Sequence, residues 1–141
     1  MLRFRLERDL LSGTLAVQDL PEAFRAGQKD LLGLDITDDS EGCLQDIHWY
    51  MGLFGYFPSY ALGAMAAAQL FEAACQSDME ILPDLARGNF QRITNWMGQN
   101  VHSLGSLYSS DEVLKRATGS ALDCAALQRH LQKRYRSARQ A

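Results

Sequence analysis

The sequence predicts an all-α protein that forms a single helical domain. Three observations support this. Apolar residues recur at helical spacing along most of the chain, no segment shows the alternation of a β-strand, and glycines follow the helical stretches where helices commonly end. With 141 residues, the chain fits one compact domain, 1–141, that would bury roughly two-thirds of its unfolded surface.

The N-terminal third contains two predicted helices and a loop. Leucines repeat every four residues in 2–10, which predicts an amphipathic helix ending near Gly13. No capping residue precedes it, so we expect it to be part of a longer helix. A second helix is expected from Pro21 to Gly33, because proline suits a first turn and glycine suits an end. The acidic stretch 35–41 reads as a loop.

The middle of the chain is expected to contain two helices separated by glycines. The acidic loop can cap a helix that continues through Tyr50 and is broken at Gly52 and Gly55. The next helix, from Pro58 to about Cys75, is rich in alanine and glycine, so we expect it to run through the centre of the domain. Further helices are expected at residues 80–87, at 90–100, at 110–117 with Ser110 as its cap, and at 123–136.

Composition excludes several classes of function. A net charge of −3 gives no electrostatic reason to expect nucleic acid as a partner. Residues 49–71 carry no Asp, Glu, Lys or Arg, but they are rich in alanine and interrupted by glycine and proline, so we expect no membrane span. The three cysteines are odd in number and far apart, which favours reduced thiols and a cytoplasmic protein over a disulfide framework.

No metal site is predicted within the chain. A zinc peptidase motif would place two histidines one helical turn apart as H-E-x-x-H, and the three histidines, His48, His102 and His130, form no such motif. A zinc site assembled from three distant histidines stays open as a minor alternative. The G-x-S-x-G elbow of serine hydrolases and the glycine-rich phosphate loop are both missing from the sequence.

One segment combines polar and aromatic residues in an unusual pattern. On a helix, Gln45, His48 and Trp49 would share one face, followed by a glycine-rich turn carrying Tyr56 and by Tyr60 at the next helix. An amide, a titratable ring, an indole and two phenols suit a polar pocket with an apolar wall. The residues alone favour a simpler alternative, because aromatic stripes are more often core packing.

The same residues resemble a known family. The segment Gly42 to Trp49 reads G-x-x-Q-D-x-H-W, which resembles a signature of the carboxypeptidase Taq family of zinc metallocarboxypeptidases. The continuation F-G-Y-F-P-S-Y-A-L-G at residues 54–63 is also similar to the family, as are shorter matches along the rest of the chain. The resemblance covers essentially the whole sequence in order, which reverses the preference for simple core packing.

The resemblance implies that residues 1–141 form the C-terminal helical segment of a larger all-α metallopeptidase. In the family, H-E-x-x-H, a third glutamate ligand and an I-R-x-x-A-D motif lie upstream of the matching region. The segment would therefore lack the zinc-binding region, and zinc is the cofactor expected for the complete enzyme. Peptide C-termini are the implied substrates, and a complementary N-terminal chain and a second copy of the chain are the implied partners.

The resemblance also implies roles for individual residues. His48 is expected to donate a hydrogen bond to the oxyanion or to a substrate carbonyl, with Tyr56 or Tyr60 as the second catalytic donor. Tyr56 is slightly preferred, because glycines border its turn. The residues expected to bind substrate or to position His48 are Gln45, Asp46 and Trp49.

Two hypotheses follow from the sequence. In the first, the chain is part of a metallocarboxypeptidase and is inactive alone, since it lacks the metal that activates water. In the second, it is a stand-alone helical binding or interaction module derived from such an enzyme, with a partner covering its exposed apolar surface. An upstream reading frame that encodes H-E-x-x-H would favour the first hypothesis.

Overall fold

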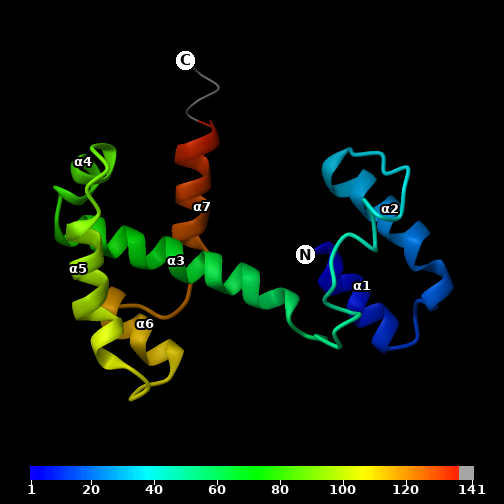
Figure 1. Ribbon diagram of the computed structural model, residues 1–141, viewed down its shortest axis with the longest axis horizontal. Helices are drawn as coiled ribbons and strands as arrows, with labels where there is room; N and C mark the ends of the chain where they lie inside the picture. The colour runs from blue at the N-terminus through cyan, green and yellow to red at the C-terminus, as the bar shows by residue number, and fades with distance from the viewer. Residues whose placement is uncertain (137–141) are drawn as a thin grey trace. The chain divides into compact units, whose positions relative to one another are not determined.

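The all-α prediction is confirmed. The computed structural model describes residues 1–136, and within them it contains seven α-helices, short 3₁₀ and π turns and no strand (Figure 1). The contacts between Cα atoms divide the chain into two compact units, Met1–Ala61 and Leu62–Ala141, and the boundary falls inside a long helix.

The first unit is built on two packed helices. Helix α1 spans Leu2–Leu11 and helix α2 spans Leu20–Leu32, with a 3₁₀ turn at Val17–Asp19 between them. Gly27 on α2 faces Leu2 on α1, and a Cβ atom there would meet the leucine side chain. Gly33 ends α2 with φ +68°, as the sequence predicts.

The core of this unit joins both helices to the following segment. Buried residues from α1, from α2 and from the segment after α2 form one cluster, Leu6, Phe24 and Cys43. Partly buried apolar residues pack against the cluster, among them Trp49. Trp49, which lines the candidate site, is therefore packed against the core of this unit.

The predicted helix through Tyr50 is wrong. Residues 38–52 form a series of turns closed by hydrogen bonds such as Gln45 N–H to Gly42 O, 3.2 Å, and Met51 N–H to Ile47 O, 3.0 Å. The carboxylate of Asp46 accepts the backbone N–H of His48 at 3.3 Å, which offers this stretch an alternative to helical bonding. The expectation that Gln45, His48 and Trp49 share a helix face fails for the same reason.

The second unit contains the remaining helices. Helix α3 spans Phe57–Ser77, close to the predicted bounds, and the other helices of this unit are α4 at Ile81–Ala86, α5 at Gln91–Asn100, α6 at Ser110–Thr118 and α7 at Ala125–Leu131. A 3₁₀ turn at His102–Leu104 follows α5, and a π turn at Gln132–Arg136 continues α7.

Two expectations for this unit need correction. The cap of α6 is Ser109 rather than Ser110, because the Ser109 hydroxyl accepts from the backbone of Glu112 while the Glu112 carboxylate accepts from the backbone of Ser109. Helix α3 is not buried along its length, since only Gln69 and Ala74 on it are fully buried.

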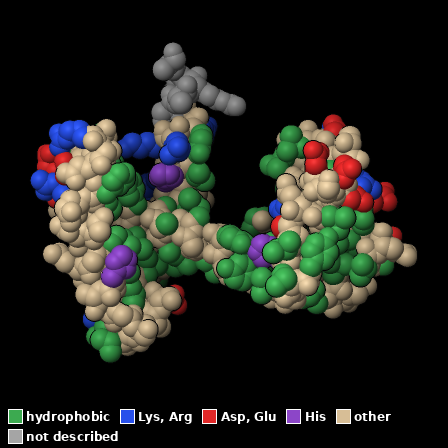
Figure 2. Space-filling view, viewed as in Figure 1, with side chains coloured by type: hydrophobic (Ala, Val, Ile, Leu, Met, Phe, Trp, Pro, Cys, Tyr) green, Lys and Arg blue, Asp and Glu red, His purple; other side chains and the backbone are tan. Residues whose placement is uncertain are grey.

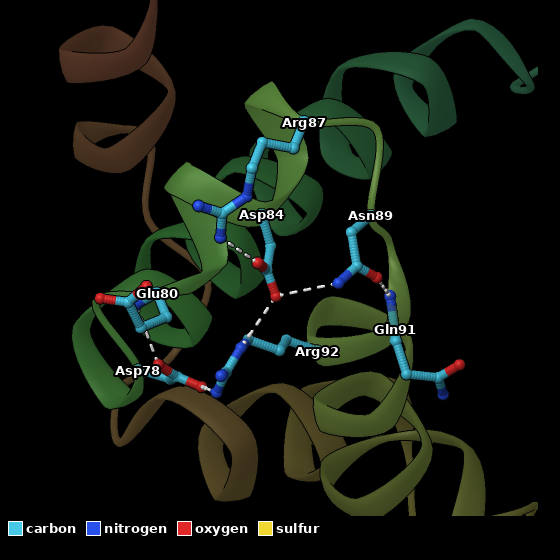
Figure 3. A network of polar contacts seen from close by, with 7 residues as sticks. All are labelled: Asp78, Glu80, Asp84, Arg87, Asn89, Gln91 and Arg92. Atoms are coloured by element: carbon cyan, nitrogen blue, oxygen red, sulfur yellow. Dashed lines mark hydrogen bonds and ion pairs between the residues drawn. The ribbon is translucent and has the colours of Figure 1, made fainter.

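Polar side chains fix the connections of the second unit. Asp84, on α4 and 6% exposed, accepts hydrogen bonds from Arg87 at 2.6 Å and Arg92 at 2.8 Å (Figure 3). Arg92 also reaches Asp78 at 2.9 Å, so one guanidinium joins the start of α4 to α5. In the described part of the chain, no helix has both the length and the hydropathy needed to cross a membrane.

Candidate functional site

The turns after α2 and the first turns of α3 bring three predicted catalytic residues together in the first unit. The imidazole of His48 has its ring centroid 5.5 Å from that of Tyr56 and 5.7 Å from that of Tyr60. The two tyrosine rings lie edge to face, 5.4 Å apart. His48 and Tyr56 therefore share one cluster, although the segment between Trp49 and Tyr56 is not helical.

A chain of hydrogen bonds runs through His48. Nδ1 of the ring lies 3.0 Å from Oδ1 of Asp46, and Nε2 lies 2.9 Å from the hydroxyl of Tyr60. Because a carboxylate can only accept, Nδ1 carries the proton, and Nε2 of the neutral ring accepts from the Tyr60 hydroxyl. This arrangement fixes both the tautomer and the orientation of the imidazole.

Asp46 is held in turn by a residue of α1. The Arg3 guanidinium forms an ion pair with Asp46 and donates a hydrogen bond to the side-chain oxygen of Gln45. Burial raises the pKa of Asp46, but the hydrogen bonds from His48 and the charge of Arg3 outweigh burial and hold this pKa below its ordinary value. Asp46 is therefore an ionised acceptor for His48 at neutral pH.

Trp49 forms an apolar wall beside the cluster. Its ring meets Phe57 edge-on, with centroids 5.8 Å apart, and Phe57 in turn lies 4.8 Å from His48. The indole N–H donates to Oε2 of Glu7 at 3.0 Å. The tryptophan is thus fixed by packing on one side and by a hydrogen bond on the other.

The cluster is open on the side of the phenols. The side chain of His48 is 16% exposed, whereas Tyr56 is 44% exposed and Tyr60 is 58% exposed. Within the described residues, the Tyr56 hydroxyl has no hydrogen-bond partner. The site can therefore offer one free phenol, and an imidazole already bonded to a second phenol, to the oxygen of a ligand.

Sequence reasoning missed Arg3, Glu7 and Phe57 as parts of this site. Arg3 and Glu7 lie one helical turn apart on α1, and Glu7 is buried beside Leu6 on the apolar side of the helix. A charged residue among the apolar positions of an amphipathic helix was the available signal. The partners of these residues, 42 to 48 positions away, were not visible in the sequence.

The segment that carries the site exposes several hydrophobic side chains. Figure 2 shows exposed hydrophobic side chains on each of the two units. In the first unit, many of them belong to the segment that carries the site, among them Leu44, Ile47, Tyr50, Met51, Leu53 and Phe54. Exposed apolar residues that form a contiguous patch are typical of an interface.

The described residues contain no metal-binding group, and the hollow in the second unit is separate from this site. Among residues 1–136, no three His, Cys, Asp or Glu side chains are grouped so that they could hold a metal ion. A hollow of about 870 Å³ in the second unit is lined by residues of α3, α4, α7 and the π turn, including Phe71, Cys75 and Arg129. None of the predicted site residues lines it, and Arg129 there is paired with Glu72.

Comparison with known proteins gives a consistent result. The family model described as carboxypeptidase Taq (M32) metallopeptidase matches residues 1–135. Thermostable carboxypeptidase 1 of Thermus thermophilus is 38% identical over 135 residues, which cover 96% of this chain and 26% of that protein. Carboxypeptidase 1 of Bacillus subtilis is also 38% identical, over 96% of this chain and 27% of its own length.

Solved structures agree with the sequence relatives. The M32 carboxypeptidase from Deinococcus radiodurans R1 matches with a TM-score of 0.91 and 37% identity, covering 99% of this chain and 28% of that one. Trypanosoma cruzi metallocarboxypeptidase 1 matches with a TM-score of 0.88 and 39% identity, over 96% and 29%. The chain spans about a quarter of the length of the curated relatives it matches.

Proposed function

Because this chain belongs to the carboxypeptidase Taq (M32) family of metallopeptidases, we propose that it supplies hydrogen-bond donors to the active site of a metallocarboxypeptidase. The chain resembles the C-terminal part of such an enzyme. The complete enzyme would hydrolyse the peptide bond that joins the last residue of a peptide, and peptide C-termini are its proposed substrates.

The observation that carries this proposal is the chain of contacts from Asp46 through His48 to Tyr60, with Tyr56 beside it. During hydrolysis, the oxygen of the scissile carbonyl gains negative charge, and donors fixed in advance stabilise that charge. Tyr56 is the first choice for such a donor because its hydroxyl is free of other partners within residues 1–136.

His48 would act as the second donor, together with Tyr60. In its neutral form Nε2 accepts from Tyr60, so donation to a substrate oxygen requires the protonated ring. Asp46 would keep Nδ1–H in place and so aim Nε2 at the open side of the site. Gln45 and Trp49 would contact the substrate, the first through its amide and the second through its ring.

Zinc is the proposed cofactor of the complete enzyme. The described residues offer no set of ligands for it, so its ligands would come from the portion of the relatives that this chain does not match. A complementary N-terminal chain is the proposed partner that brings them, and a homodimer is the proposed assembly. Three free cysteines support a cytoplasmic location.

A chimeric enzyme tests the role of His48. Residues 1–135 would replace the matched segment of Bacillus subtilis carboxypeptidase 1, and release of C-terminal residues from a peptide would be measured with zinc present. His48→Ala should lower kcat about a hundredfold, the usual effect of losing one oxyanion donor. His102→Ala, in the second unit, is the matched control and should leave kcat within a factor of two or so. Unchanged kcat in His48→Ala would remove His48 from the mechanism.

The same chimera separates the two tyrosines. Tyr56→Phe and Tyr60→Phe each remove one hydroxyl and keep the ring, so the variant with the larger loss of kcat identifies the donor. A second candidate function, a stand-alone binding module, draws support from the exposed apolar residues of the first unit. Robust peptidase activity of the isolated chain with zinc would contradict both the module and the proposed location of the metal site.

A further inference from the structure

Glu7 is a buried carboxylate with an unusual set of partners. It lies on α1 and is 2% exposed. Oε2 accepts the indole N–H of Trp49 at 3.0 Å, and Oε1 accepts the backbone N–H of Gly55 at 2.6 Å. No lysine or arginine forms an ion pair with it among residues 1–136. Burying a carboxylate without a cation is costly, so the two hydrogen bonds are needed to compensate for the loss of water.

The two donors lie next to the proposed catalytic residues in the sequence. Trp49 directly follows His48, and Gly55 directly precedes Tyr56. One carboxylate therefore holds both ends of the segment 49–55, and the residue just outside each end carries a ring of the site. The two bonds connect α1 to positions 42 and 48 residues away.

Packing transmits this restraint to the rings. Trp49 meets Phe57 edge-on at 5.8 Å between centroids, and Phe57 lies 4.8 Å from His48. Gly55 has φ +80°, a conformation that suits glycine, and its N–H donates to Glu7. A change in either hydrogen bond would alter the start or the end of the segment and so the distance between His48 and Tyr56.

We infer that Glu7 is a positioning residue that sets the separation of the His48 and Tyr56 rings by binding both ends of segment 49–55. It acts through Trp49 and Gly55 and touches neither ring itself. The value of this separation for catalysis rests on the proposed function, but the geometric claim does not.

The chemistry of the carboxylate explains why glutamate is needed. Each of its two oxygens accepts one N–H. A glutamine has the same shape but offers one acceptor and one donor, so its NH₂ group would face either the indole N–H or the Gly55 N–H. Glu7→Gln therefore removes one of the two bonds with almost no change in volume.

NMR on the ¹⁵N- and ¹³C-labelled full chain tests this inference. In the wild type, we expect slow exchange of the Trp49 indole N–H and the Gly55 N–H, and a nuclear Overhauser effect between the rings of His48 and Tyr56. In Glu7→Gln, at least one of the two N–H groups should exchange tenfold faster or more, and the ring contact should weaken. Helical amides of α1 should keep their protection.

Two control variants separate positioning from general loss of stability. Asp9→Asn removes the same charge from the same helix. Among the described residues the Asp9 side chain has no hydrogen bond, so this variant should leave the ring contact unchanged. Leu20→Ala weakens the packing of α2 against the core of the unit, and should also leave the ring contact in place. Equal loss of the ring contact in Leu20→Ala and Glu7→Gln would overturn the inference.

A second variant keeps the test decisive if Glu7→Gln does not fold. Trp49→Phe keeps an aromatic ring next to Phe57 but removes the indole donor, and should weaken the contact between His48 and Tyr56. An unchanged contact in a folded variant of either kind would overturn the inference. A failure of His48→Ala to affect the chimera would instead contradict the proposed function and leave the positioning role of Glu7 standing.

Discussion

Asp46 connects an arginine on the first helix to the imidazole of the candidate site. The Arg3 guanidinium pairs with one carboxylate oxygen, and Nδ1 of His48 bonds to the other. A single carboxylate thus determines which nitrogen of His48 carries the proton. Asp46 accepts this proton only when it is ionised, so the hydrogen bonding of His48 depends on the groups that surround Asp46.

Replacing Arg3 should raise the pKa of Asp46. Burial favours the neutral acid, and Arg3→Met would remove a cation and a hydrogen bond that oppose burial. A carboxyl group whose pKa is lowered by folding stabilises the protein above its ordinary pKa, and this contribution disappears as the pH falls through the lowered value. The variant should therefore be less stable than the wild type at neutral pH, with the difference closing in acid.

A ¹³C titration of the Asp46 carboxyl group and urea unfolding at neutral and acid pH would check this prediction. Arg5→Met is the matched control, because Arg5 is exposed on the same helix and does not contact Asp46. An Asp46 pKa that is the same in wild type and Arg3→Met would show that Arg3 contributes nothing to its ionisation.

Among the helices, α6 has the best-defined beginning. Ser109 and Glu112 form a reciprocal capping box, with the Ser109 hydroxyl and the Glu112 carboxylate each accepting a backbone N–H of the other residue. At the other end, Gly119 adopts φ +79° and its N–H bonds to Lys115 O at 2.8 Å. At both ends of this nine-residue helix, neighbouring residues of the chain therefore supply hydrogen-bond partners to free backbone groups.

The cap predicts an asymmetry between two adjacent serines. Ser109→Ala should lower the free energy of unfolding by about 1 kcal/mol, since it leaves first-turn N–H groups without an acceptor. Ser110→Ala should have an effect of less than about 0.5 kcal/mol, because Ser110 already lies inside the helix. Urea unfolding followed by circular dichroism measures both values, and equal losses would contradict the assignment of the cap.

The helices that the sequence predicts correctly are those with local signals. Apolar periodicity and glycine ends predict the bounds of α1 and α2 closely, and Pro58 predicts the start of α3, because these features act within a few residues. The stretch 42–50 was predicted as a helix and forms turns, because the Asp46 side chain bonds to the backbone nearby and competes with helical bonding.

The sequence predicts the residues of the candidate site, but not the residues of α1 that hold them in place. His48 and both tyrosines were named from their spacing and from the family signature, and the structure brings them together. Arg3 and Glu7 were missed as part of the site, because their bonds span more than forty positions and no local pattern encodes them. The catalytic roles of His48, Tyr56 and Tyr60 remain predictions.

Across the whole molecule, ionised carboxylates stabilise both units. Folding lowers the pKa of acidic groups that accept hydrogen bonds from arginine or backbone N–H groups, namely Asp38, Asp46, Glu72, Asp78, Asp84 and Glu112. Asp84 is the most buried of them, and hydrogen bonds from Arg87 and then Arg92 outweigh the effect of its burial on its pKa.

Acid should therefore destabilise the protein. The free energy of unfolding should fall as the pH drops below about 4, near the ordinary pKa of an aspartate, because the unfolded chain then binds more protons than the folded one. Asp84→Asn should be less stable than the wild type at neutral pH and should show a shallower loss in acid. Urea unfolding at several pH values measures both slopes.

The control is Asp30→Asn, which removes an exposed carboxylate of α2 that has no partner within residues 1–136. Its stability should follow the wild-type curve with pH. A wild-type curve that stays flat down to pH 2 or so would contradict the stabilising role of these carboxylates.

The amide of Gln69 has a consequence for the order in which the second unit assembles. Its Nε2 donates to Thr118, Ser120 and Ala121, and its Oε1 accepts from the backbone N–H of Asp123, all of them 49 to 54 positions further along the chain. Closing a loop of this length costs conformational entropy, and only the contacts formed after closure offset that cost. The connection between α6 and α7 should thus acquire its final shape only after α3 and α6 have met, and its amides should open to solvent together with the whole unit.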